Sequence, residues 1–146
     1  MRGLKPVRVL GIAVVVTALA SAVAYATNGS SLKIVLPAHA HAHHKFMYSI
    51  KGTFPTRPGG AWVIVLSQPK SRACQSTEPK DWHGPSAYEV NWARVSLSPF
   101  TVKDKYRGYS RQARRLCAYL YTYMFFPLGN SQGSTLLARA TVVIPK

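Results

Sequence analysis

The sequence predicts an all-β fold: an antiparallel sandwich of two sheets with six or seven strands, preceded by a helical signal segment. After His44, short apolar runs alternate with clusters of Gly, Pro, Ser and Asn, a rhythm typical of strands and turns. No long stretch repeats its apolar residues with the 3.6-residue period of an amphipathic helix. The chain of 146 residues has room for one domain of ordinary size after a targeting segment. A small barrel is the alternative arrangement of the same strands.

Residues 1–26 are expected to be a signal peptide. They consist of a basic start, an uncharged apolar run and the small-x-small pattern Ala24-Tyr25-Ala26, after which we expect cleavage. The alternative is an uncleaved N-terminal membrane anchor, because residues 9–26 reach 18 residues, the lower limit for crossing a bilayer. In that case the protein would associate with a membrane through residues 9–26. Both alternatives place the folded part outside the cytoplasm, either secreted or at the cell surface.

The remaining chain is expected to divide into two parts. Residues 27–45 are small, polar and rich in His and Ala, which predicts a flexible tether. Its short apolar stretch 32–37 is a candidate for one added edge strand. Residues 46–146 form the predicted sandwich domain.

The strands are predicted from alternation of apolar and polar residues. In the first, Phe46, Tyr48 and Ile50 share one face, whereas residues 61–68 are apolar on both faces and are expected to be central. Two further patterns place Cys117, Tyr119, Tyr121 and Tyr123 on one face of residues 114–125, and Leu136, Ala138, Ala140, Val142 and Ile144 on one face of the last strand. We interpret the tyrosines as core or half-covered sheet rather than as a ligand face. The expected strands are residues 45–54, 61–68, 87–97, 100–106, 114–125 and 136–144.

Cys74 and Cys117 are the two cysteines of the chain. In an exported protein an even pair predicts one disulfide. The cysteines are 43 residues apart, and a bridge across a loop of that length stabilises the fold by about 3 to 4 kcal/mol in the chain-entropy model.

The run "RRLCAYLYTYMFFPLGNSQGSTLLARATVVI", together with "RACQSTEPKDW" upstream, resembles the closing half of immunoglobulin-like domains in exported bacterial proteins. The resemblance covers about the last 100 residues and implies an immunoglobulin-like sandwich that presents a binding surface. The chain departs from antibody-type domains because Cys74 lies in a Pro-rich excursion, and neither Trp82 nor Trp92 has the usual spacing from it. The comparison therefore implies a loop-to-strand disulfide instead of a sheet-to-sheet one packed against Trp.

The charge balance favours anionic partners. Nineteen Lys and Arg face four Asp and Glu, a net charge of +15, which falls to +12 when residues 1–26 are removed. The basic residues cluster in "KDKYRGYSRQARR", 103–115, with tyrosines between them. The expected partner is an anionic polymer of the envelope or the extracellular space. A solvated loop without a ligand is the alternative. The candidate anion-binding residues are Lys103, Lys105, Arg107, Arg111, Arg114 and Arg115.

The segment "PAHAHAHHKF", 37–46, is a candidate zinc or copper site. In an extended chain, side chains two residues apart lie on the same side at about 6.6 to 7 Å, so that neighbouring imidazoles can converge on one ion. The alternative is a tether that merely contains histidine. No other cofactor is expected. The candidate ligands are His39, His41, His43 and His44.

Catalysis is not expected. Only four carboxylates are available for acid or base chemistry, and the chain has no G-x-S-x-G motif. Asp81 and His83, in "DWHG", are better explained by a turn. The sequence therefore predicts an exported, non-catalytic module that binds anionic partners through a basic face, with zinc or copper capture as the alternative function.

Overall fold

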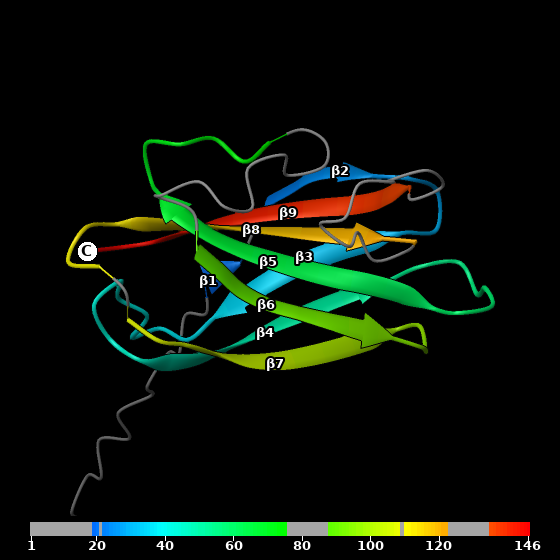
Figure 1. The fold of residues 1–146 in the computed structure, drawn as a ribbon, viewed down its shortest axis with the longest axis horizontal. Coiled ribbons are helices and arrows are strands. Elements are labelled where there is room, and N and C mark those ends of the chain that lie inside the picture. Colours follow the sequence, from blue (N-terminus) through cyan, green and yellow to red (C-terminus); the bar gives the residue numbers. More distant parts are fainter. Residues whose placement is uncertain (1–18, 21, 76–87, 109, 123–134) are drawn as a thin grey trace, which may run out of the picture.

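The computed structural model describes residues 19–20, 22–75, 88–108, 110–122 and 135–146. These residues form strands and connections, arranged in two antiparallel sheets (Figure 1). The strands are β1 (Leu19–Ala20), β2 (Ala22–Ala26), β3 (Ser31–Leu36), β4 (Phe46–Thr53), β5 (Ala61–Pro69), β6 (Tyr88–Val95), β7 (Phe100–Tyr106), β8 (Arg114–Tyr121) and β9 (Leu136–Ile144). Over the same residues, no helix has the length and apolar character needed to cross a membrane.

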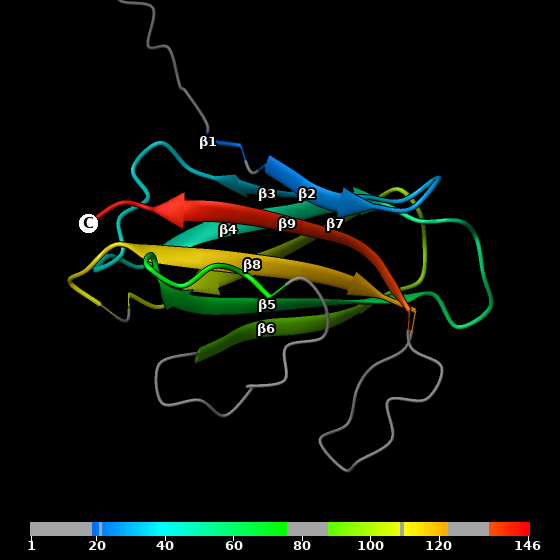
Figure 2. The ribbon, with the colours of Figure 1, turned by 90° about the horizontal axis from the view of Figure 1, so that it is seen from above.

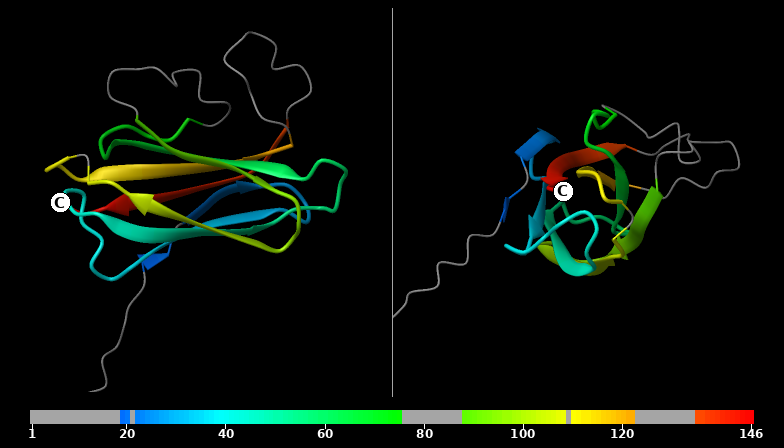
Figure 3. Two further views of the ribbon diagram at one scale, coloured as in Figure 1. Left: turned by 60° about the horizontal axis from the view of Figure 1, so that its bottom comes forward. Right: turned by 90° about the vertical axis from the view of Figure 1, so that its left-hand side faces the viewer.

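The two sheets lie one over the other, as the end-on view in Figure 3 shows. The first sheet has the strand order β1-β3-β4-β7, and the second has the order β2-β9-β8-β5-β6. The connections from β2 to β3, β4 to β5 and β6 to β7 each pass from one sheet to the other. The all-β prediction with two antiparallel sheets is therefore confirmed.

The core between the sheets is built by alternation of side chains along the strands. Strands β3, β4, β5, β8 and β9 send alternate residues inward over most of their length, and these inward residues are almost fully buried. This alternation confirms that Phe46, Tyr48 and Ile50 share one buried face. The largest fully buried side chains of this core are Leu32, Ile34, Leu36, Ile50, Val63, Tyr106, Leu116, Leu120 and Ile144.

Part of the outer face of the second sheet is buried as well. Ile64, Leu66, Cys117, Tyr119 and Tyr121 form a separate apolar cluster there, distinct from the core between the sheets. The central position predicted for residues 61–68 is confirmed, because β5 pairs with both β6 and β8.

The last strand departs from the predicted alternation at its start. A bulge between Leu120 and Tyr121 shifts the pairing with β9, so that Leu136 packs with the outer cluster. Ala138, Ala140, Val142 and Ile144 face the core between the sheets as predicted. The bulge adds one residue to β9, so that the side chains before it point to the opposite face from the one that strict alternation gives. The predicted face of Leu136 was wrong for this reason.

The segment expected to be a flexible tether belongs instead to the folded domain. Residues 31–36 form β3, an interior strand of the first sheet paired with β1 and β4. Leu32, Ile34 and Leu36 are completely buried. The boundary at residue 45 is therefore wrong, because these three alternating apolar side chains gain more from burial in the core than from a solvated tether.

Part of the expected signal segment is also extended. β1 pairs with β3, and β2 pairs with the outer edge of β9, where Figure 2 shows it lying alongside. Strands rather than helix thus occupy 19–20 and 22–26, because the edge of β9 offers backbone partners to this stretch. Residues 1–18, which hold most of the predicted helix, lie outside the described residues.

Candidate functional site

The outer face of the first sheet carries four exposed lysines. Strands β3, β4 and β7 bury alternate residues, so the residues between them point outward. We call the set Lys33, Lys51, Lys103 and Lys105 the lysine face. All four side chains are exposed to solvent.

Strand pairing brings these lysines together from three separate parts of the chain. Lys33 lies directly opposite Lys51 across the β3–β4 pair. Across the β4–β7 pair, Ser49 is opposite Lys103 and Met47 is opposite Lys105. Residues directly opposite on neighbouring strands have Cβ atoms about 4.5 to 5.5 Å apart, and two like charges at that position oppose folding. The strand register therefore places positive charges next to one another although their repulsion lowers the stability of the fold.

No carboxylate neutralises the lysine face within the described part of the first sheet. Asp104 is the only acidic residue of strands β1, β3, β4 and β7, and it lies between Lys103 and Lys105 along β7. Its side chain turns to the opposite face, where the Tyr48 hydroxyl donates a hydrogen bond of 3.1 Å to it. The outward surface of this sheet is thus cationic without internal ion pairs.

A shallow hollow of about 480 Å³ opens on the same sheet beside Lys103. Val35, Ser49 and Lys103 are successive partners across β3, β4 and β7, and they form one row of its lining. Met47, which is 55% exposed, also lines the hollow. The lining residues are Val35, Leu36, Pro37, Met47, Tyr48, Ser49 and Lys103.

The structure divides the predicted anion-binding residues. Lys103 and Lys105 belong to the lysine face, whereas Arg107 and Arg111 are exposed in the connection between β7 and β8. Arg115 is half-buried on β8 in the other sheet. The segment 103–115 is therefore not one continuous basic loop, because its two ends are strands of different sheets.

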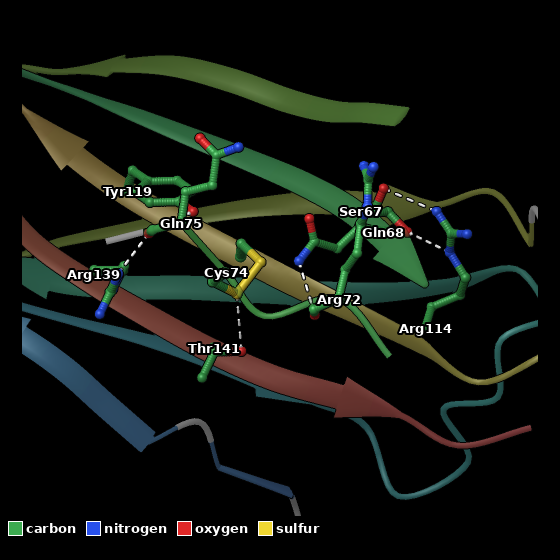
Figure 4. The surroundings of a disulfide bond; sticks show 10 residues. Ser67, Gln68, Arg72, Cys74, Gln75, Arg114, Tyr119, Arg139 and Thr141 are labelled. Atoms are coloured by element: carbon green, nitrogen blue, oxygen red, sulfur yellow. Dashed lines mark hydrogen bonds between the residues drawn. A yellow bond between two sulfur atoms is a disulfide. The ribbon is translucent and has the colours of Figure 1, made fainter. Parts of the chain in front are cut away.

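Arg114 has a structural position that is incompatible with anion binding at the surface. Its side chain is only 5% exposed. Its guanidinium donates from Nε to Ser67 Oγ at 3.1 Å and from Nη2 to the Ser67 carbonyl oxygen at 2.9 Å, as Figure 4 shows. A buried guanidinium with these partners holds β8 against β5. The prediction of Arg114 as an anion-binding residue is wrong for this reason.

The histidine segment 39–44 is anchored through the alanines between its histidines. Ala40 and Ala42 are buried in the core. The backbone of Ala42 is held on both sides, because its N–H donates to the Pro145 carbonyl at 2.8 Å and its carbonyl accepts from the Tyr106 hydroxyl at 3.0 Å. The alternation of His and Ala thus places alanine inward and histidine outward.

Three of the four predicted metal ligands lie close together. The ring centroids of His43 and His44 are 4.0 Å apart, and His41 lies 6.1 Å and 6.0 Å from them. His41 Nδ1 is 2.7 Å from the backbone oxygen of Lys146. Across the described residues, however, no group of three His, Cys, Asp or Glu side chains is placed so that it could hold a metal ion.

The same cluster changes the acid–base behaviour of one ring. Partial loss of hydration lowers the pKa of His43 below its usual 6.5, and the neighbouring charges of His44, His41 and Arg111 lower that pKa further. The loss of hydration and the clustering of charges thus disfavour protonation of His43.

Cys74 and Cys117 are joined by a disulfide, with Sγ atoms 2.00 Å apart (Figure 4). Cys117 lies within β8, and Cys74 lies in the connection that follows β5, so the loop-to-strand arrangement is confirmed. The next residue, Gln75, accepts hydrogen bonds at its carbonyl oxygen from the Tyr119 hydroxyl and from Arg139. The disulfide and these bonds fasten the connection to the outer face of the second sheet.

The predicted tyrosine stripe is buried where the structure describes it. Tyr119 and Tyr121 are almost inaccessible to solvent and belong to the outer cluster of the second sheet. Burial raises the pKa of the Tyr119 hydroxyl, although Arg139 and the hydrogen bond to Gln75 act in the opposite direction. Tyr123 lies outside the described residues, as do Asp81 and His83 of the catalytic alternative.

Sequence reasoning missed the lysine face because only two of its members lie in the basic segment 103–115. Lys33 was placed in the expected tether, and Lys51 lies in the strand predicted at 45–54, outside the basic segment. The available signal was the alternation itself, since each lysine occupies an outward position between buried residues. The pairing register needed to join the strands is not visible in the sequence.

Comparison with known proteins finds no family model, no curated protein and no solved structure that matches this chain.

Proposed function

We propose that this protein is an exported, non-catalytic binding module that captures an anionic polymer through its lysine face. The observation that carries the proposal is the cross-strand pair of Lys33 and Lys51, extended by Lys103 and Lys105 on a surface with no carboxylate among its described residues. Like charges in this position oppose folding, so a bound anion is the simplest physical reason for keeping them there.

The spacing of the charges favours a polymer over a single small anion. Neighbouring strands are about 4.8 Å apart, so β3 and β7 are separated by roughly 10 Å, and Lys103 lies about 7 Å from Lys105 along its strand. A single small anion cannot contact ammonium groups spread over such an area. A chain with repeated phosphate, sulfate or carboxylate groups contacts several of them at once and releases the counterions around them.

The location outside the cytoplasm has independent support. A pair of cysteines at bonding distance is consistent with an oxidising compartment. Together with the N-terminal signal pattern, it supports secretion or display at the cell surface. The two antiparallel sheets with crossing connections support an immunoglobulin-like sandwich as the scaffold. In this proposal the scaffold presents the lysine face and carries out no chemistry.

Zinc or copper capture by His39, His41, His43 and His44 has weaker support. His39 makes no ring contact with the other three among the described residues. His41 is already engaged with the backbone of Lys146. Ligation would therefore require the segment 39–44 to rearrange against the contacts that hold Ala42.

A column of immobilised inorganic polyphosphate tests the proposal. One variant replaces all four residues of the lysine face by Gln. The matched control removes the same number of positive charges elsewhere on the surface, through Lys45→Gln, Lys70→Gln, Arg107→Gln and Arg111→Gln, all at exposed positions. We expect the lysine-face variant to elute at much lower salt, with the slope of log affinity against log salt reduced by about one per lysine. Equal shifts in the two variants would show that net charge alone governs retention.

The single substitution Lys51→Gln provides a stability test of the same proposal. Because Lys51 faces Lys33, its neutralisation should raise the free energy of unfolding by about 0.2 to 1 kcal/mol at low salt while it weakens polyphosphate binding. Urea unfolding at low and high salt measures this change, which should shrink as salt screens the pair. A destabilised Lys51→Gln protein would contradict the assignment of this pair to binding.

A further inference from the structure

We infer that the hollow beside Lys103 binds the apolar chain of an anionic amphiphile, whose charged head group lies on the lysine face. This inference rests on the proposed function and narrows the anion to one that carries an acyl or alkyl chain. The hollow measures about 480 Å³, a size typical of sites for small molecules.

The lining of the hollow offers both apolar contacts and a positive charge to a ligand. Val35, Pro37 and Met47 supply apolar surface on one side. Lys103 stands at the other side as a cation. A neutral polar ligand gains little from contact with this apolar surface. An inorganic anion would contact Lys103 but would leave the apolar surface exposed to water. A molecule with an alkyl chain and a negative head group uses both halves of the lining.

Met47 is the residue that a bound chain would cover. Its side chain is 55% exposed on the outer face of β4, although a large apolar side chain gains most when it is buried. Methionine is unbranched and adaptable, which suits a surface that closes over flexible chains. Across the strand pair it faces Lys105, so an alkyl chain resting on Met47 keeps its head group close to a lysine.

Ser49 connects the two halves of the hollow. It lies between Val35 and Lys103 in the row of partners that crosses β3, β4 and β7. Its outward, half-buried hydroxyl can donate a hydrogen bond to a phosphate or carboxylate oxygen held by Lys103. The head group thereby gains a charge-assisted contact and a directional one. A cationic amphiphile would meet only positive charge at this position.

Octyl phosphate, kept below its micelle concentration, tests the inference, with inorganic phosphate and octyl glucoside as the two matched probes. Inorganic phosphate has the charge without the chain, and octyl glucoside has the chain without the charge. We expect octyl phosphate alone to shift the methyl resonances of Met47 and Val35 in a saturable titration. Equal affinity for octyl phosphate and inorganic phosphate would overturn the inference, as would equal affinity for octyl phosphate and octyl glucoside.

Substitutions separate this site from the rest of the lysine face. Met47→Ser should weaken octyl phosphate binding about tenfold, the effect of withdrawing about two methylene groups from burial, and should leave retention on polyphosphate unchanged. Lys33→Gln, outside the hollow, should lower polyphosphate retention without affecting octyl phosphate. Retention on polyphosphate without octyl phosphate binding would overturn this inference and leave the proposed function intact. A protein that bound neither polyphosphate nor octyl phosphate would overturn both the proposed function and this inference.

Discussion

Arginine and lysine have different roles in this protein. Arg94 donates from Nε to the Gly59 carbonyl at 3.0 Å, Arg114 is buried against Ser67, and Arg139 donates to the Gln75 carbonyl. The planar guanidinium suits such directional contacts with backbone oxygens. The lysines of the lysine face have no carboxylate partner among the described residues, and their flexible ammonium groups point to solvent. Side-chain chemistry thus separates the cations that stabilise the fold from those available to a ligand.

His43 provides a test of the histidine cluster at the scale of a single ring. Its pKa lies below 6.5 because of partial desolvation and the nearby charges of His44, His41 and Arg111. Since the unfolded chain binds this proton more readily, the contribution of His43 to stability is present above pH 6.5 and is lost as the pH falls toward its lowered pKa. An NMR titration of the ring protons measures that pKa directly.

Arg111→Gln is the informative variant for this titration. Removal of a neighbouring positive charge should move the pKa of His43 upward, toward 6.5. Lys70→Gln, which removes an exposed charge in the connection after β5, should leave it unchanged. A His43 pKa at or above 6.5 in the unmodified protein would contradict the described arrangement of the rings.

At the scale of strands, the pairing of β2 with β9 conflicts with the expected cleavage after Ala26. Cleavage there would remove β1 and β2, and would leave β3 and β9 as the outer strands of the two sheets on one side of the molecule. Backbone groups of β9 that pair with Ala22, Val23, Tyr25 and Ala26 would then face solvent. An exposed strand edge is a template for pairing with another chain.

Hydrogen exchange can measure the contribution of β2. We expect amides of β9 between Ala138 and Thr141 to exchange faster in a chain that begins at Thr27 than in one that begins at Leu19. Amides of β8 that pair with β5 serve as the internal control, because neither neighbour is removed. Identical protection of β9 in both chains would show that β2 does not cover this edge in solution.

The strands that the sequence predicted well are those whose two faces differ clearly. Residues 46–53 and 100–106 were recognisable because buried and exposed residues alternate throughout. The alternation of Leu32, Ile34 and Leu36 suggested at most an added edge strand, because His and Ala around it suggested a tether, whereas the structure pairs this strand on both sides. The bulge at Leu136 had no local signal, because it depends on how β8 and β9 fit together. Tertiary pairing decided both of these cases.

At the scale of the whole molecule, the disulfide and the lysine face lie on opposite sides. Cys117 is in the cluster on the outer face of the second sheet, whereas the lysine face covers the outside of the first sheet. The core between the sheets separates them. The sequence indicated the cysteine pair and the excess of positive charge, but their distribution over two faces depends on the sheet order. Stability and binding should therefore be separable by mutation.

The double variant Cys74→Ala, Cys117→Ala tests this separation. Loss of a bridge that closes 43 residues should lower the free energy of unfolding by about 3 to 4 kcal/mol, measured by urea unfolding. At a temperature where the variant remains folded, its retention on polyphosphate should match that of the unmodified protein, since no residue of the lysine face contacts the disulfide. The lysine-face variant should show the reverse pattern, with weakened retention and no loss of stability. If the folded cysteine variant lost its retention, the two faces would be coupled through the core, and the lysine face would depend on the packing of the second sheet.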